Sequence, residues 1–140
     1  MSDCKNTHKG HCLCGEISFE YWGKVNWCCH CHCESCRRNT SSAFTTFFGV
    51  PRKSYRFTGK KPGVYSSSPG QNRLFCTTCG APVAFEGARY PDEIHFYMAS
   101  LENPEILTPK FHVHYAEKLS WVELKDDLPK FDGFWEKQEK

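Results

Sequence analysis

The sequence lacks the segments that direct a chain into a membrane or out of the cell. No window holds the roughly 18 consecutive apolar residues that a membrane-spanning helix needs. Residues 1–10 are polar and contain no apolar core like that of a secretory signal peptide. The net charge is only +2, from 18 basic and 16 acidic side chains. We therefore expect a cytoplasmic protein whose main partner is neither a membrane nor a nucleic acid.

The chain also lacks repeats, dividing linkers and the alternation of strands and helices that a nucleotide-binding α/β domain shows. Its 140 residues fit one domain. Helix is expected only after Cys33, running into Arg37 and Arg38, and from Phe134 onward. Runs rich in β-branched and aromatic residues predict strands at 17–21, 43–50, 55–57, 83–85, 94–98, 111–115 and 119–124. The predicted fold class is mainly β, with short antiparallel sheets and a single domain.

Cysteine is the residue that the chain has in excess, with ten among 140 residues. An even number permits disulfides in a secreted domain. The missing secretory segment, the sufficient length and the CxC and CxxC spacings favour metal binding by reduced thiols instead. Seven cysteines form three groups: Cys12 and Cys14, then Cys31, Cys33 and Cys36, then Cys76 and Cys79.

The last group, Cys76-x-x-Cys79 followed by Gly80, has the spacing of a zinc knuckle. A glycine at that point supplies the positive φ that such a turn often needs. A structural zinc takes four ligands, so this pair needs two partners from elsewhere. Cys12 and Cys14 are the natural choice, because using them leaves the middle group intact.

The middle group places three thiolates, those of Cys31, Cys33 and Cys36, within six residues. Three protein ligands with one exchangeable position are typical of catalytic zinc. Three thiolates on Zn²⁺ total −1, so such a centre suits a bound substrate thiolate better than it suits hydrolysis. The alternative is a second structural zinc closed by Cys28, Cys29, His30 or His32. Cys4 has no partner in these motifs, and for Cys28 and Cys29 both burial and metal binding are open.

Taken in order, the three motifs resemble the glutathione-dependent formaldehyde-activating enzyme family, which also contains the zinc domain of centromere protein V. They read Gly10-x-Cys12-x-Cys14-Gly15, Cys31-His-Cys33-x-x-Cys36-Arg37-Arg38 and Phe75-Cys76-x-x-Cys79-Gly80. Residues 99–104, 109–114, 121 and 127–129 extend the resemblance, which covers roughly residues 8–132. We take residues 1–7 as a flexible N-terminus and residues 133–140 as a polar C-terminal tail.

The resemblance implies a β-tent zinc fold of small antiparallel sheets with two zinc ions per chain. It implies a carbon–sulfur lyase that condenses formaldehyde with glutathione, its co-substrate, to S-(hydroxymethyl)glutathione. Carried over residue by residue, the structural zinc falls to Cys12, Cys14, Cys76 and Cys79. The catalytic zinc falls to Cys31, Cys33 and Cys36.

Other side chains carry weaker signals. Arg37 and Arg38 lie beside the middle thiolates and suit the carboxylates of glutathione, although they would equally balance the anionic centre or face solvent; Arg73 is a weaker candidate. His112 and His114 share one face of a predicted strand, and we expect that face to be exposed. We expect the large aromatics to be mostly core, with one or two lining a substrate cleft: Phe44, Phe47, Phe48, Phe85, Phe96 and Tyr97.

Two other functions fit part of the pattern. His32-x-Glu34 followed by Cys76-x-x-Cys79 imitates the zinc deaminase signature, but no proline precedes Cys76 and five motif cysteines would be left unused. A non-enzymatic zinc module that binds protein or nucleic acid is the stronger rival. Such a module would be expected to carry a basic stripe or extension, which this chain lacks.

Overall fold

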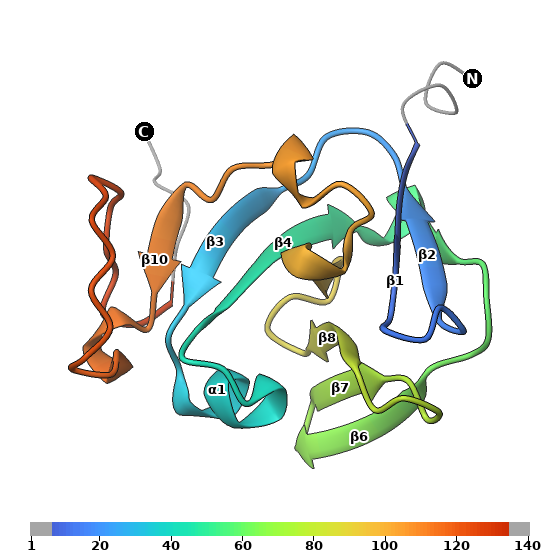
Figure 1. The fold of residues 1–140 in the computed structure, drawn as a ribbon, viewed down its shortest axis with the longest axis horizontal. Coiled ribbons are helices and arrows are strands. Elements are labelled where there is room, and N and C mark those ends of the chain that lie inside the picture. The colour runs from blue at the N-terminus through green and yellow to red at the C-terminus, as the bar shows by residue number, and fades with distance from the viewer. Residues whose placement is uncertain (1–6, 135–140) are drawn as a thin grey trace.

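The computed structural model describes residues 7–134, and their fold is mainly β, as predicted. Two sheets form it, one with strand order β1-β2-β5 and one with order β10-β3-β4-β9-β8-β7-β6 (Figure 1). The strands are β1 (His8–His11), β2 (Ser18–Tyr21), β3 (Trp27–Cys31), β4 (Thr45–Pro51), β5 (Tyr55–Phe57), β6 (Gly63–Ser68), β7 (Gln71–Phe75), β8 (Pro82–Gly87), β9 (Glu93–Tyr97) and β10 (Phe111–Val113). The α-helix is α1 (Glu34–Thr40), and four 3₁₀ turns are η2 (Arg52–Ser54), η3 (Met98–Ser100), η4 (Pro104–Ile106) and η5 (Tyr115–Glu117).

All strand pairs in the two sheets are antiparallel except one, because β10 runs parallel to β3. The strand predicted over 111–115 ends at Val113, since His114 adopts a positive φ of 53° and begins the turn η5. The strand predicted over 119–124 is wrong. Lys118 Nζ donates to the carbonyls of Leu119 and Val122, and these bonds wrap the segment into a turn around the lysine.

The patterns missed β1, β3, β6 and β7 for a physical reason. Strand β3 is largely cysteine and histidine, and β6 is largely serine, so neither shows the apolar alternation of a half-buried strand. The predicted helix after Cys33 is confirmed as α1. The helical end expected from Phe134 onward lies, apart from Phe134 itself, which is not helical, on residues 135–140, and Cys4 lies in residues 1–6; both ranges are outside the described residues.

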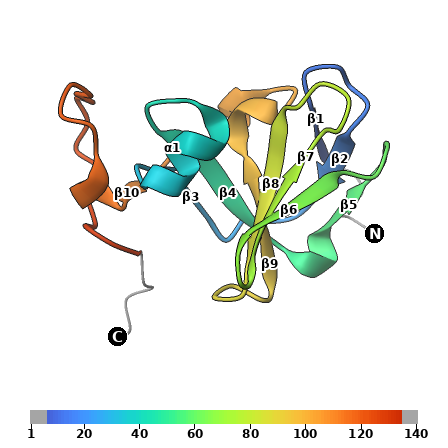
Figure 2. The same ribbon diagram turned by 90° about the horizontal axis from the view of Figure 1, so that it is seen from below.

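The two faces of the seven-stranded sheet differ: one packs into the core, and the other lines a cavity. On one face Phe48, Ile94 and Phe96 are fully buried and pack against the small sheet, where Phe19 stacks on Phe96 with ring centroids 4.0 Å apart. The neighbouring residues Phe47 and His95 point to the other face, because side chains alternate along a strand. The second face forms a cavity, and α1 lies at one end of it, beside β4 (Figure 2).

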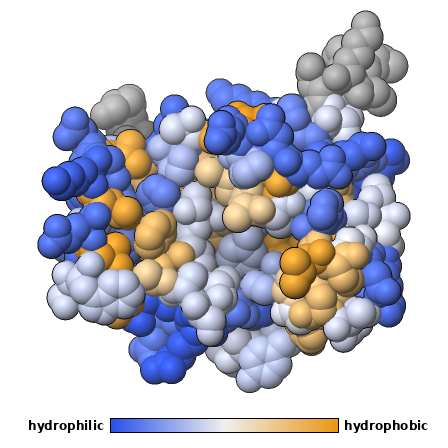
Figure 3. Space-filling model, in the orientation of Figure 1, coloured by the Kyte–Doolittle hydropathy of each residue, from blue (hydrophilic) through white to orange (hydrophobic). Residues whose placement is uncertain are grey.

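The surface seen in Figure 3 shows hydrophobic residues in separate small patches among polar ones. Within residues 7–134, no helix is both long enough and apolar enough to span a bilayer.

Candidate functional site

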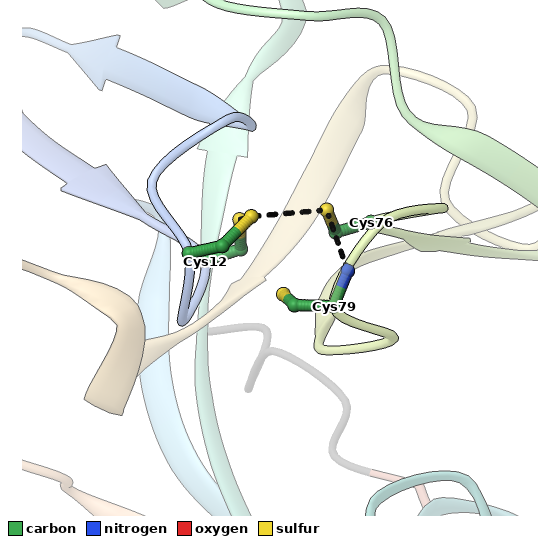
Figure 4. Close-up of side chains that lie close together, drawn as sticks. Cys12, Cys76 and Cys79 are labelled. Atoms are coloured by element: carbon green, nitrogen blue, oxygen red, sulfur yellow. Dashed lines mark hydrogen bonds between the residues drawn. The ribbon is translucent and has the colours of Figure 1, made fainter.

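Four cysteine sulfurs converge from two loops that lie far apart in the sequence. Cys12 and Cys14 follow β1, and Cys76 and Cys79 follow β7, so that the sulfurs face one another across the two loops (Figure 4). All four lie within 4.8 Å of one another, and the Cys12–Cys14 and Cys14–Cys76 Sγ–Sγ distances are both 3.7 Å. A tetrahedral zinc with Zn–S bonds of about 2.3 Å has S–S edges of about 3.8 Å. The cluster therefore fits a four-coordinate zinc.

Backbone N–H groups of the loops around this cluster point at its sulfurs, although against the hydrogen bond from the Glu16 N–H, burial and the neighbouring sulfurs raise the pKa of Cys14 to about 12. Backbone N–H groups donate to sulfur from Ile17 to Cys12 at 3.3 Å, and from Thr78 and Cys79 to Cys76 at 3.4 Å. The backbone N–H of Ala81 lowers the pKa of Cys79 to about 6. Gly80, with a φ of 80°, permits the tight turn. The site thus holds its sulfurs ready for a metal.

Cys31, Cys33 and Cys36 form a second cluster whose sulfurs also lie within 4.8 Å of one another. Cys31 is the last residue of β3, and Cys33 is the N-cap of α1, where its sulfur accepts a hydrogen bond from the Cys36 N–H at 3.3 Å. The Cys31–Cys36 Sγ–Sγ distance is 3.7 Å, again the edge expected for a zinc tetrahedron. Helix α1 therefore supplies two of the three thiols from its first turns.

Among the described residues, no fourth His, Cys, Asp or Glu joins this second cluster. The four side chains considered as closing ligands are engaged or directed elsewhere. Cys28 turns into the core and donates to Met98 Sδ at 3.4 Å, His30 bonds Thr46, and His32 bonds His112. Cys29 lines the cavity instead of joining the three sulfurs. We call Cys31, Cys33 and Cys36 the three-thiolate centre, for the form in which they could bind a metal; the described chain supplies no fourth ligand atom to it.

One cation is buried against this three-thiolate centre. Arg73, only 7% exposed, places Nη1 3.8 Å from Cys36 Sγ, and its guanidinium covers the Phe85 ring at 4.6 Å. Hydrogen bonds from Cys31 and Cys33, together with the Arg73 charge, lower the pKa of Cys36 to about 3, whereas the pKa values of Cys31 and Cys33 are raised within the same cluster. The centre therefore carries negative charge that a fixed guanidinium partly balances.

The three cysteines open into a cavity of about 380 Å³. Its walls are largely aromatic, with Trp27, Phe47, Phe85, Tyr90 and Phe111 among the lining residues. Its polar groups include Arg73, Arg89, Gln71 and His95. A volume of this order, mostly apolar with a few polar groups, is typical of a small-molecule site.

The end of this cavity that lies away from α1 is formed where the pairing of β3, β4 and β9 brings three residues side by side. Gly49 pairs with Trp27 on one side and with His95 on the other, and the Trp27 ring lies over the glycine. A Cβ on Gly49 would lie 2.6 Å from Trp27 Cε2. Glu93 accepts from Trp27 Nε1 at 2.9 Å and contacts His95 Nε2 at 2.8 Å. Any larger residue at position 49 of β4 would therefore collide with the indole ring of Trp27.

The structure brings some predicted residues into the site and leaves others out. Phe47 and Phe85 line the cavity, which confirms that a minority of the large aromatics face it. Arg37 Nε donates to the His32 carbonyl, and Arg38 pairs with Glu34 in solvent; neither lines the cavity. The weaker candidate, Arg73, is the arginine beside the thiolates. Sequence reasoning missed Trp27, Arg89, Tyr90 and His95, which belong to none of the motifs.

The exposed face predicted for His112 and His114 is wrong for His112. Its side chain is fully buried, because its ring packs against those of His30, His32 and Tyr115 and contacts the Asp126 carboxylate. His114 is partly buried and lines the cavity.

A small mainly β protein with a four-cysteine cluster and a three-cysteine cluster that opens into a cavity is a candidate metal-binding enzyme. Comparison with known families gives the particular family: the model of the glutathione-dependent formaldehyde-activating enzyme family matches residues 7–117. The chain belongs to this family.

Two further proteins are similar to the chain. A Schizosaccharomyces pombe protein named "Uncharacterized lyase C29B12.13" is 33% identical over 78 residues, which make up 56% of this chain and 56% of that protein. The chain thus matches little more than half of that relative's length. A Rhodobacter sphaeroides protein of known crystal structure has a TM-score of 0.58 at 22% identity, covering 72% of this chain and 91% of that one. This second likeness supports the fold.

Proposed function

We propose that this chain is a zinc-dependent enzyme of the carbon–sulfur lyase type that promotes the addition of glutathione, or a similar thiol, to formaldehyde, giving S-(hydroxymethyl)glutathione. The observation that carries the proposal is the three-thiolate centre at one end of a small-molecule cavity, in a chain of this family. One zinc would be held by Cys31, Cys33 and Cys36, and a second by the four-cysteine cluster. Both clusters need reduced thiols, so the proposal includes a cytoplasmic location.

Zinc bound by three thiolates would supply a soft, exchangeable position for a fourth sulfur. The chain's own residues do the rest. Trp27, Phe47 and Phe85 wall the cavity with apolar surface, which strengthens charge interactions inside it. Arg73 offsets the negative charge that three thiolates and a substrate sulfur bring together.

The reaction itself places a demand on Arg73. The thiol sulfur forms a bond to the carbonyl carbon, the C=O π bond breaks, and the oxygen takes the negative charge. The thiol has lost one proton and the oxygen gains one, so atoms and charge balance over the whole reaction. A preplaced cation beside developing negative charge is a strong contribution to catalysis. The guanidinium of Arg73 contacts the thiolate centre through Cys36. It is buried and stacked on the Phe85 ring, so it is held in place beside the reacting sulfur.

The carboxylates of glutathione need further partners. Arg89 lines the same cavity, with its guanidinium over the Phe134 ring at 4.1 Å, and we propose it for one carboxylate. Arg37 and Arg38 lie outside the cavity lining, so a role for them requires a ligand that extends beyond its rim.

The test begins with zinc per chain, measured by elemental analysis before and after titration with glutathione, followed by a formaldehyde-consumption assay. We expect two zincs, saturable glutathione binding and formaldehyde-dependent product. Cys33→Ser should lose the binding and one zinc, whereas Cys28→Ala, which removes a thiol that belongs to neither cluster and does not line the cavity, should keep both. Two zincs that ignore glutathione and formaldehyde would refute the enzyme and favour a non-enzymatic zinc module.

A further inference from the structure

A buried histidine chain lies on the far side of β3 and β10 from the cavity, and the proposed chemistry does not use it. His32 Nε2 and His112 Nδ1 are 2.9 Å apart, and His112 Nε2 lies 3.0 Å from Asp126 Oδ2. His32 and His112 are both fully buried, and their rings stack with centroids 5.1 Å apart. Asp126 is partly exposed, with 26% of its side chain accessible. Burying two linked imidazoles is costly unless their hydrogen bonds are made, so this series of linked side chains needs a structural or functional explanation.

The carboxylate at one end determines which atom carries each hydrogen. Desolvation opposes ionisation, but hydrogen bonds from His112, from the Leu128 N–H and from Lys130 together outweigh it and lower the pKa of Asp126 to about 2. An ionised carboxylate only accepts, so His112 Nε2–H donates to Asp126 and Nδ1 of the same ring becomes an acceptor. With the His112 ring neutral, His32 Nε2–H donates to His112 Nδ1. The order of donation runs from His32 through His112 to Asp126.

The hydrogen-bonded series His32–His112–Asp126 ends at the peptide segment that carries two of the three thiolates. His32 lies between Cys31 and Cys33, and its side chain points away from their cluster toward His112. Its backbone N–H donates to the Val113 carbonyl at 3.1 Å, so the residue is tied to β10 twice.

Strand β10 is only three residues long and is held from its other side by the segment around Lys130. His112 N–H donates to the Pro129 carbonyl at 2.9 Å, and Phe131 N–H donates to the His112 carbonyl at 2.9 Å. Asp126 is fixed in turn by the Leu128 N–H at 3.0 Å and by Lys130 Nζ at 3.2 Å. The ligand segment, β10 and residues 126–131 thus form one hydrogen-bonded unit. Asp126 itself lies beyond the residues that the family model matches.

We propose that Asp126 and His112 are positioning residues for the three-thiolate centre: through His32 they hold the Cys31–Cys33 segment so that its sulfurs face a metal. The inference rests on the proposed metal at that centre. It assigns a role to a residue 90 positions after the last thiolate, counted from Cys36 to Asp126. Groups that orient metal-binding segments through hydrogen bonds typically change metal affinity about 10- to 100-fold when removed.

The test compares zinc affinity at the two centres by competition with a chromogenic chelator, with the three-thiolate centre identified as the one lost in Cys33→Ser. Asp126→Ala should weaken zinc about 10- to 100-fold at that centre and leave the four-cysteine centre unchanged. Asp126→Asn keeps an acceptor oxygen for His112 and should stay within about threefold of wild type. Asp127→Ala, the exposed neighbouring acid, is the matched control and should have no effect.

Equal zinc affinities in Asp126→Ala and wild type would overturn the inference, and so would an equal loss at both centres, which marks general destabilisation. A wild-type chain that binds one zinc only would overturn this inference together with the proposed function. Two zincs without formaldehyde chemistry would overturn the proposed function alone, and the affinity comparison would still decide the role of Asp126.

Discussion

Replacing Arg73 by methionine tests the chemistry proposed for the cavity, because it removes the buried cation and keeps a side chain of similar length. The guanidinium Nη1 is 3.8 Å from Cys36 Sγ. At an effective dielectric constant of 20, two unit charges at that distance interact by about 4 kcal/mol, an upper bound. Hydrogen bonds to charged groups contribute about 1.5–3 kcal/mol net. We therefore expect kcat/KM for formaldehyde to fall about 10- to 150-fold.

The assay follows product formation at saturating glutathione, with glutathione binding and thermal unfolding measured on the same samples. Arg73→Lys keeps the charge but loses the planar fork, so it should fall between methionine and wild type. Arg56→Met is the matched control, since Arg56 is exposed and pairs with Glu20 on the small sheet. Added guanidinium should partly restore an Arg73→Ala variant. A methionine variant within about twofold of wild type, at unchanged zinc content, would refute the assigned role.

Two further predictions concern folding and the cavity wall. Cys76→Ser should prevent stable folding, because structural zinc binding supplies folding free energy, whereas Cys33→Ser should stay folded with one zinc. Circular dichroism together with metal analysis distinguishes the two variants. A soluble Cys76→Ser chain that binds two zincs would contradict the four-cysteine assignment. Gly49→Ala should displace Trp27, cost about 1–3 kcal/mol in unfolding free energy and weaken glutathione binding. Gly133→Ala meets no atom within 4 Å and serves as its control, so equal behaviour of the two variants would show that the close approach of Trp27 is not required.

The cysteine clusters could be predicted because their geometry is local. A CxC or CxxC spacing brings two sulfurs within reach of one ion whatever the rest of the chain does. Only the pairing of Cys12 and Cys14 with Cys76 and Cys79 needed a choice, and the structure places these four together.

The cavity could not be predicted, because it depends on which strands become neighbours. Trp27 and His95 meet across Gly49 only because β4 separates β3 from β9 in the sheet. Side chains alternate along a strand, so Arg73 must point away from the core face that Leu74 occupies. This could not be predicted, because the sequence of β7 lacks the alternation of apolar and polar residues that marks a strand. His112 was misjudged for a related reason: a two-residue periodicity identifies a face without saying what covers it.

The parallel pairing of β10 with β3 has a consequence for the order in which the centres mature during synthesis. All four cysteines of the first cluster have left the ribosome once residue 79 has been added and extruded. The second cluster has its thiols much earlier, by residue 36, yet its ligand segment must wait for residues 111–113 and 126–131 before its hydrogen bonds exist. A growing chain would therefore gain its structural clamp first and its reactive centre last. Since domains fold from the N-terminal side as they emerge, the proposed thiol-binding centre would be completed only when most of the chain has already folded.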